Sequence, residues 1–166
     1  MKLLQIIADL LEYPATWTNR KEEIWKLVNE SDSPNRHLVL EFLKIASNYN
    51  ELDLEEMYVR TFDNNDYTTL NMTYYITGDE KSRTKPPQRG FLLVWLKERV
   101  KPSGNELPDY LPYLLRYLSE NDDYHVKDVL KNPMRVLTER LNERKSVFYP
   151  LVLAAYLELY GGENVI

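Results

Sequence analysis

The sequence predicts an all-α fold, and three observations lead to this prediction. Apolar residues recur with the period of a helix along most of the 166 residues. Helix-start signals, a polar cap residue or a proline, stand between these segments. Alternation of period two, which would indicate strands, is nowhere sustained. Because a chain of this length is within the range of one domain, we expect a single helical domain over residues 1–166.

The first predicted helix lies in "MKLLQIIADLLEYP". Its apolar residues fall at i, i+3, i+4, i+7 and i+8 on one helix face, and they are Leu3, Ile6, Ile7, Leu10 and Leu11. Gln5, Asp9 and Glu12 interrupt the run, which favours an amphipathic helix over a cleaved signal peptide. Since no apolar stretch approaches the roughly 20 residues that span a bilayer, we expect a cytoplasmic protein.

Two cap signals predict the next helices. Ser33-Pro34 has the form of an N-cap followed by proline at the first helical position, and a helical apolar stripe follows it. Asp53 with Glu56 three residues on resembles a capping box. It predicts the start of a helix that runs through "YVRTFD" at residues 58–63.

Three further helices are predicted in the second half. One follows Gly90 and has Leu92, Leu93, Trp95 and Leu96 on its apolar side. Asn132-Pro133 predicts the start of another. The last, in "PLVLAAYLELYGG", is apolar on nearly all sides, so we expect it at the centre of the fold, ending near Gly161.

Residues 79–89, "DEKSRTKPPQR", are the single compositional break. The segment is polar, contains adjacent prolines and has a local excess of positive charge. It predicts a mobile surface loop, which is either a plain connection or a functional element, because loops of this length are uncommon in compact domains.

The segment "LPDYLP" at residues 107–112 predicts a sharply fixed helix entry. If Asp109 is the N-cap, then Tyr110, Leu111 and Pro112 occupy the first helical positions, where a proline loses no helical hydrogen bond. Two stripes then follow along the helix. One consists of Leu111, Leu114, Leu115 and Leu118, and the other of Tyr110, Tyr113 and Tyr117. The leucines are expected in the core, and the tyrosines at its edge, where they either line a groove or close the rim.

The composition argues against most catalytic chemistry. The chain has no cysteine, which excludes disulfides, thiolate metal sites and iron–sulfur ligation in this chain. The two histidines are far apart, and neither has a second ligand at helical spacing, so no zinc site is expected. The acidic run at 63–66 lacks the glycine and the glutamate that a calcium loop requires. The net charge of −5 argues against nucleic acid or a membrane surface as a partner. A binding role is therefore favoured.

Several motifs give the chain a family resemblance. They are "YVRTFD" at 58–63, Leu70, "TYY" at 73–75, Gly78-Asp79, Arg89-Gly90 and "ELPDYLP" at 106–112. Together with "LLEYP" near the start and "NPMRVLTERLNERKS" near the end, they cover nearly the whole chain. In this set the sequence resembles the NarJ family, the assembly chaperones of molybdenum-containing respiratory nitrate reductase, within the wider group that includes TorD.

The resemblance implies an all-helical chaperone that is not an enzyme and holds no cofactor stably. Such a protein binds the N-terminal segment of the apo catalytic (alpha) subunit of nitrate reductase in the cytoplasm, until that client receives its molybdenum cofactor and docks to its membrane partner. An acidic helical domain rich in tyrosine suits helix-in-groove recognition of a basic, amphipathic peptide. The alternatives are a chaperone of a related molybdoenzyme, of the chlorate or dimethyl sulfoxide reductase type, and a helical enzyme that uses carboxylates and metal.

The candidate client-binding residues lie on these motifs and on the tyrosine stripe. They are Tyr58, Phe62, Asp63, Leu70, Tyr74, Tyr75, Arg89, Asp109, Tyr110, Tyr113 and Tyr117. Asp63 stands out because a carboxylate at a helix C-terminus faces the negative end of the helix dipole. It needs another partner, and two are open: Arg89 across the 79–89 loop, or a basic residue of the client.

Overall fold

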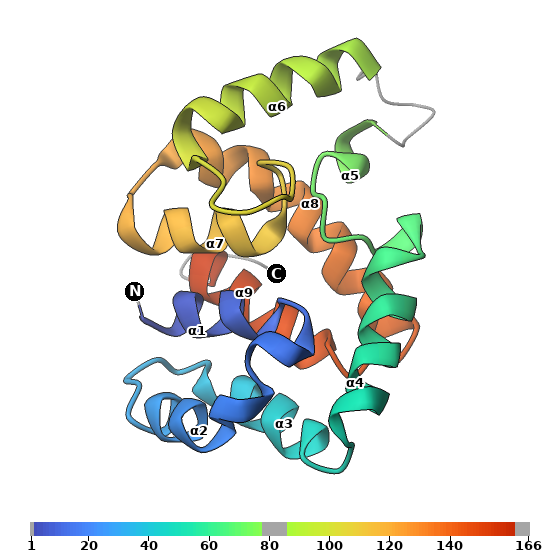
Figure 1. Cartoon of the computed structure of the whole chain (residues 1–166). Coiled ribbons are helices and arrows are strands. Elements are labelled where there is room, and N and C mark those ends of the chain that lie inside the picture. Colours follow the sequence, from blue (N-terminus) through green and yellow to red (C-terminus); the bar gives the residue numbers. More distant parts are fainter. Residues whose placement is uncertain (1, 78–85, 162–166) are drawn as a thin grey trace.

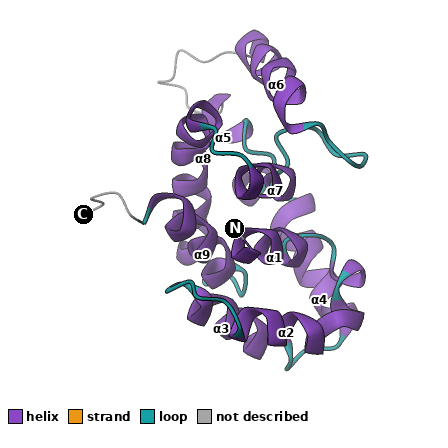
Figure 2. Cartoon of the chain, turned by 90° about the vertical axis from the view of Figure 1, so that its left-hand side faces the viewer, coloured by secondary structure: helices purple, strands orange, loops and turns teal. Residues whose placement is uncertain are grey.

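The computed structural model describes residues 2–77 and 86–161, and these ranges contain helices, turns and loops but no β-strand (Figures 1 and 2). This confirms the predicted all-α fold. The α-helices are α1 (Lys2–Leu10), α2 (Lys21–Asn29), α3 (Arg36–Ala46), α4 (Glu51–Tyr58), α5 (Tyr74–Thr77), α6 (Pro86–Val100), α7 (Leu111–Glu120), α8 (Tyr124–Glu143) and α9 (Tyr149–Tyr160). The shorter turns are η1 (Pro14–Thr16), η2 (Thr18–Arg20), η3 (Val59–Asp63), which is π-helical, and η4 (Asp66–Thr68).

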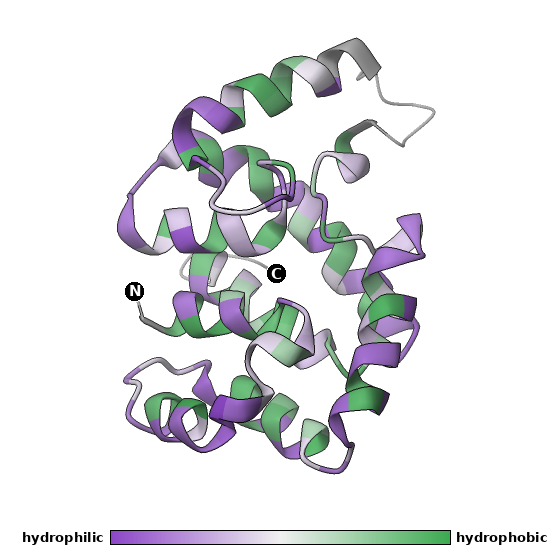
Figure 3. Ribbon diagram, viewed as in Figure 1, coloured by the Kyte–Doolittle hydropathy of each residue, from purple (hydrophilic) through white to green (hydrophobic). Residues whose placement is uncertain are grey.

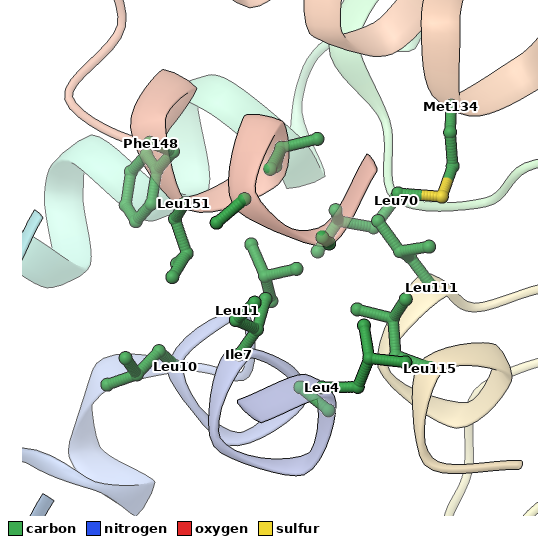
Figure 4. Close-up of a cluster of buried hydrophobic side chains, with 14 of the residues drawn as sticks. Leu4, Ile7, Leu10, Leu11, Leu70, Leu111, Leu115, Met134, Phe148 and Leu151 are labelled. Atoms are coloured by element: carbon green, nitrogen blue, oxygen red, sulfur yellow. The ribbon is translucent and has the colours of Figure 1, made fainter. Parts of the chain in front are cut away.

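The hydrophobic core forms around α1 and α9. Helix α1 packs against α7 and α9, and α9 also packs against α8 and α3. In Figure 4, Leu4 and Ile7 of α1 face Leu115 of α7, and Leu151 of α9 lies on the other side of the same cluster. Most of the α9 side chains are buried, so the apolar character of "PLVLAAYLELY" reflects the central position that the sequence predicts for it.

The other helices surround this core. Helices α2 and α3 form one end of the molecule and α6 the opposite end, where α6 contacts α5 and α7 (Figures 1 and 2). Most helices carry both hydrophobic and hydrophilic residues, as Figure 3 shows. This mixture is expected of helices that present one face to the core and the other to solvent. Within the described ranges, no helix combines the length and the apolarity needed to cross a bilayer.

Two helix starts differ from the prediction by a few residues. Helix α4 begins at Glu51, because the Asn50 side chain is the cap and accepts from the Asp53 N–H at 2.8 Å. Helix α3 begins at Arg36, two residues after Pro34. The Ser33 hydroxyl is used differently: it accepts from the Asn35 N–H and donates to the Glu158 carboxylate of α9.

The prediction that Asn132-Pro133 starts a helix is wrong, because Pro133 lies inside α8. The helix begins after Asp123, whose carboxylate accepts from the first-turn N–H groups of His125 and Val126. A continuous buried stripe crosses the proline, and it consists of Val126, Leu130, Met134, Leu137 and Leu141. Burial of this stripe outweighs the roughly 3 kcal/mol that an interior proline costs.

Helix α6 begins at Pro86 and contains Gly90, so it starts earlier than predicted. The predicted loop over 79–89 falls mainly on residues 78–85, which lie outside the described residues. Its last four residues, 86–89, are helical instead.

Candidate functional site

The "LPDYLP" segment is paired with residues 70–73. The Leu111 N–H donates to the Leu70 carbonyl at 2.9 Å, and the Met72 N–H donates to the Asp109 carbonyl at 3.0 Å. These two bonds form an isolated antiparallel β-bridge. The entry to α7 is therefore fixed by a contact with a segment almost forty residues earlier.

The Asp109 side chain anchors this pairing and is fully buried. Its carboxylate accepts from Asn71 Nδ2 at 3.0 Å, from the Thr73 N–H at 3.0 Å and from the Thr73 hydroxyl at 2.5 Å. The prediction that Asp109 caps α7 is wrong. The helix begins at Leu111 with Tyr110 at the N-cap position, and no side chain makes a cap bond there.

Arg89 and Tyr74 extend this anchor to the surface. Arg89 Nε donates to Thr73 Oγ1 at 2.8 Å, and the guanidinium carbon lies 4.4 Å from the centroid of the Tyr74 ring, a cation–π contact. Tyr74 is exposed, whereas Arg89 is only partly so. The structure thus brings Tyr74, Arg89 and Asp109, three of the predicted site residues, into one cluster.

A second cluster joins α4, α7 and the end of α1 through tyrosine hydroxyls. The Tyr58 hydroxyl donates to the Leu11 carbonyl at 2.8 Å and lies 3.0 Å from the Tyr110 hydroxyl. The Tyr110 hydroxyl donates to Glu12 at 3.2 Å, and Glu12 forms an ion pair with Arg116 at 2.8 Å. Burial is the main cause that raises the pKa of Tyr58 and of Tyr110, so both hydroxyls stay protonated as donors.

Most predicted site residues belong to the interior rather than to a surface. Seven are buried, and they are Tyr58, Phe62, Leu70, Tyr75, Asp109, Tyr110 and Tyr113. Phe62, for example, packs its ring against Tyr58 and Phe148 at centroid distances of 5.0 and 4.9 Å. The residues with substantial exposure are Asp63, Tyr74, Arg89 and Tyr117.

Asp63 ends the π-helical turn η3, as the sequence predicts for the end of this helix. Among the described residues it forms no ion pair with Arg89, which is engaged with Thr73 and Tyr74. Partial burial raises the pKa of Asp63. The pKa of Glu106 is raised as well, first by burial and then by the negative charges of Asp63, Glu12 and Asp109. The surface at Asp63 and Glu106 is therefore acidic.

An apolar groove lined by none of the candidate client-binding residues lies beside this acidic surface. It has a volume of about 340 Å³ and lies between Tyr13 and one face of α4. We call it the Tyr13–Leu52 groove; its lining consists of Tyr13, Leu52, Glu55, Glu56, Val59 and Arg60. Leu52 is 63% exposed, and the Tyr13 ring packs edge-on against Tyr58 with centroids 5.8 Å apart. Partial desolvation, and then the negative charge of Glu55, raise the pKa of Tyr13, although its ring remains exposed. The one signal in the sequence is that Leu52 falls among acidic residues on the polar side of α4.

A larger groove follows the tyrosine stripe of α7. It has a volume of about 570 Å³ and lies between α1, α7 and the loop after α6. Tyr113 and Tyr117 line it, as one of the two interpretations of the stripe predicts, together with Asp9, Arg99, Lys101, Arg116 and Glu120. Its charges are mixed, and Arg116 is already paired with Asp9 at 2.9 Å. The Tyr117 hydroxyl donates to Asp123 at 2.7 Å, and this bond lowers the pKa of Asp123.

Metal-ligating side chains do not gather in the described part of the chain. Over residues 2–77 and 86–161, no group of three or more histidine, aspartate or glutamate side chains is placed to hold a metal ion. The groups that the fold does concentrate are apolar and acidic side chains on a helical surface. These are means of binding another molecule.

The chain is thus an all-helical protein that exposes an apolar groove beside acidic side chains, and comparison with curated proteins gives its family. The chain is 31% identical over 167 residues to the probable nitrate reductase molybdenum cofactor assembly chaperone NarJ of Bacillus subtilis (strain 168), and the match covers 93% of this chain and 88% of that protein. This chain belongs to the NarJ family of nitrate reductase molybdenum cofactor assembly chaperones, which confirms the resemblance seen in "YVRTFD" and "ELPDYLP".

Two proteins of Escherichia coli (strain K12) agree with this assignment. The nitrate reductase molybdenum cofactor assembly chaperone NarJ is 27% identical over 160 residues, covering 90% of this chain and 67% of its own length. The probable chaperone NarW is 30% identical over 166 residues, covering 97% of this chain and 69% of its own length. No family model matches the chain.

Proposed function

We propose that this chain is an assembly chaperone of a respiratory nitrate reductase. In this role it binds the N-terminal segment of the apo catalytic subunit in the cytoplasm and keeps that subunit from its membrane partner until the molybdenum cofactor is inserted. The cofactor goes to the client, and the chaperone itself performs no catalysis. The names of the family relatives support the role in nitrate reductase assembly.

The Tyr13–Leu52 groove is the observation that carries the peptide-binding part of the proposal. Leu52 and Tyr13 expose apolar surface that the fold itself leaves uncovered. Glu55 and Glu56 border the groove, and Asp63 follows along the same helical segment. A basic, amphipathic helix matches this surface, because its apolar face would cover Leu52 and Tyr13 while its cations meet the carboxylates.

The predicted site residues then divide into two roles. We propose that the buried ones support the surface from below, as Tyr58 does when it packs against the exposed ring of Tyr13. Asp63 is proposed to contact the client directly. Tyr74, Arg89 and Tyr117 lie on other exposed surfaces and are available to the rest of the client.

Replacement of Leu52 by serine tests the groove. Loss of the leucine contact should weaken binding of a synthetic peptide from the client N-terminus by about tenfold or more, as measured by calorimetry. Melting should change little, since Leu52 is mostly exposed. Val94→Ser is the matched control, because Val94 is 60% exposed on a helix but lies in α6, outside the groove. If both variants bind the peptide as the unaltered chain does, the groove is not the client site.

The charge on Asp63 is expected to serve binding rather than stability. Because partial burial raises the pKa of Asp63, the folded chain takes up this proton more readily than the unfolded chain, and stability from this group grows as the pH falls. Asp63→Asn should therefore leave the melting temperature unchanged or slightly higher. The variant should bind the peptide more weakly and with a flatter dependence on salt. A clear drop in melting temperature would show instead that Asp63 has a partner within the fold.

The pH dependence of binding gives an independent check on the same carboxylates. The pKa values of Asp63 and Glu106 are raised, so both groups lose their charge at a higher pH than ordinary carboxylates do. Peptide binding should weaken as the pH falls through the range in which these two carboxylates lose their charge, and it should weaken less in Asp63→Asn.

Peptides from chlorate and dimethyl sulfoxide reductases, tested in parallel, distinguish a nitrate reductase chaperone from a chaperone of a related molybdoenzyme.

A further inference from the structure

A second pocket at the end of α4 is lined by cations, and it shares Arg60 with the Tyr13–Leu52 groove. It has a volume of about 250 Å³ and lies between the end of α4 with η3 and the turn that joins α8 to α9. Its three cationic residues are Arg60, Arg144 and Lys145, and its apolar residues are Met57, Leu141 and Val147. We call it the Lys145 pocket.

The charge of the Lys145 pocket is opposite to that of the chain. The protein carries 26 acidic and 21 basic side chains, yet no acidic residue lines this pocket. Over the described ranges, none of its three cations takes part in an ion pair. Polar groups that accept and donate hydrogen bonds, among them Asn65 and Ser146, complete the lining.

One of the cations is held in place by an aromatic ring. The guanidinium carbon of Arg144 lies 4.5 Å from the centroid of the Tyr67 ring. Tyr67 is itself fixed, because its hydroxyl donates to Glu143 at 3.0 Å and its carbonyl accepts from Arg140 at 3.0 Å. A guanidinium restricted in this way loses less freedom when it binds an oxyanion.

The dipole of α8 explains only part of this arrangement. Arg144 and Lys145 follow the C-terminus of α8, where cations are favoured without any ligand. Arg60 comes from a different element, η3, and the same pocket includes it. Three cations from two elements around one cavity match an anion that carries more than one charge, as a phosphate monoester does near neutral pH.

We propose that the Lys145 pocket binds a small organic phosphate. The phosphate group meets the three cations, and the carbon skeleton contacts Met57, Leu141 and Val147. The volume lies below the roughly 300–1,000 Å³ of pockets that enclose drug-sized ligands, so the ligand is a compact one rather than a dinucleotide. Arg60 lines both this pocket and the Tyr13–Leu52 groove, whereas Arg144 and Lys145 line only the pocket, so variants of these two residues test the phosphate proposal separately from the client-binding proposal.

Phenyl phosphate is the probe, with inorganic phosphate and benzyl alcohol for comparison, and binding is followed by NMR shifts of the Asn65 and Ser146 amides. At low ionic strength phenyl phosphate should bind with a dissociation constant of about 1 mM or tighter. Inorganic phosphate should bind more weakly, benzyl alcohol should not bind, and added salt should weaken binding. Arg144→Gln and Lys145→Gln should each weaken binding by about tenfold, because each removes one charge-assisted contact.

Lys26→Gln is the matched control, because Lys26 lies in the last turn of α2 and outside the pocket. It should bind phenyl phosphate as the unaltered chain does, and the melting temperature of each variant verifies its folding. The proposal is overturned if phenyl phosphate does not shift these amides at about 10 mM, or if Lys26→Gln and Lys145→Gln lose affinity equally. It is also overturned if inorganic phosphate binds as tightly as phenyl phosphate.

Discussion

Asp109→Ala should lower the free energy of unfolding by about 3–5 kcal/mol, because it removes the buried carboxylate that accepts from Asn71 Nδ2 and from the N–H and hydroxyl groups of Thr73. The effect is large for two reasons: the carboxylate is fully buried, and its donors lie in the loop that it fastens to the start of α7. Chemical denaturation followed by circular dichroism measures the difference.

Asp109→Asn is the informative companion variant. The asparagine side chain keeps the shape of the aspartate and one acceptor oxygen, but its NH₂ group faces some of the Asn71 and Thr73 donors. We therefore expect a smaller loss in the free energy of unfolding, of about 1–3 kcal/mol. If Asp109→Ala unfolds at the same denaturant concentration as the unaltered chain, the pairing of residues 70–73 with 109–111 does not depend on this carboxylate.

Leu114→Ala should destabilise the fold by about 2–5 kcal/mol, as expected for truncation of a buried leucine with a cavity left behind. Leu114 lies in α7 and is buried where that helix packs against the core. The same denaturation experiment measures the loss, which should appear without a change in the helical signal of the folded chain.

Tyr117 provides the matched comparison one turn further along α7. It is only partly buried and loses chiefly its hydrogen bond to Asp123, so Tyr117→Ala should cost about 1 kcal/mol. Equal losses for the two variants would place Tyr117 in the core and exclude it from the groove that it lines with Tyr113.

Helical periodicity predicted the interior of this fold well. Helix α1 is buried on one face, and its apolar residues recur with the helical period. Helix α9 is buried on nearly all sides, and it is apolar almost throughout. The cap signals were less successful. Asp53 lies in the first turn of α4 rather than at its cap, because Asn50 offers the same kind of side-chain oxygen three residues earlier.

Asp109 shows why the site could be predicted only in part. Its sequence neighbourhood suits a helix cap, but its donors are 36 and 38 residues away, and no local pattern records such a contact. The tyrosines were misleading for a related reason. A tyrosine at the edge of a predicted core can turn its hydroxyl inward when another buried polar group is there, as Tyr58 and Tyr110 do with each other. Leu52 is exposed, and its position among acidic residues on the polar side of α4 is the only local signal that separates it from a core leucine.

The packing of α1 against α7 and α9 sets the order in which this chain can fold. Its principal partners begin at Leu111 and Tyr149, more than a hundred residues later in the sequence. During synthesis the apolar face of α1 stays uncovered until those helices have been made, because closing so long a segment must precede the contacts that stabilise it. Such long-range contacts raise the contact order, so the chain should refold more slowly than a bundle of sequential helices. A chaperone of this architecture is itself exposed to aggregation during its own synthesis.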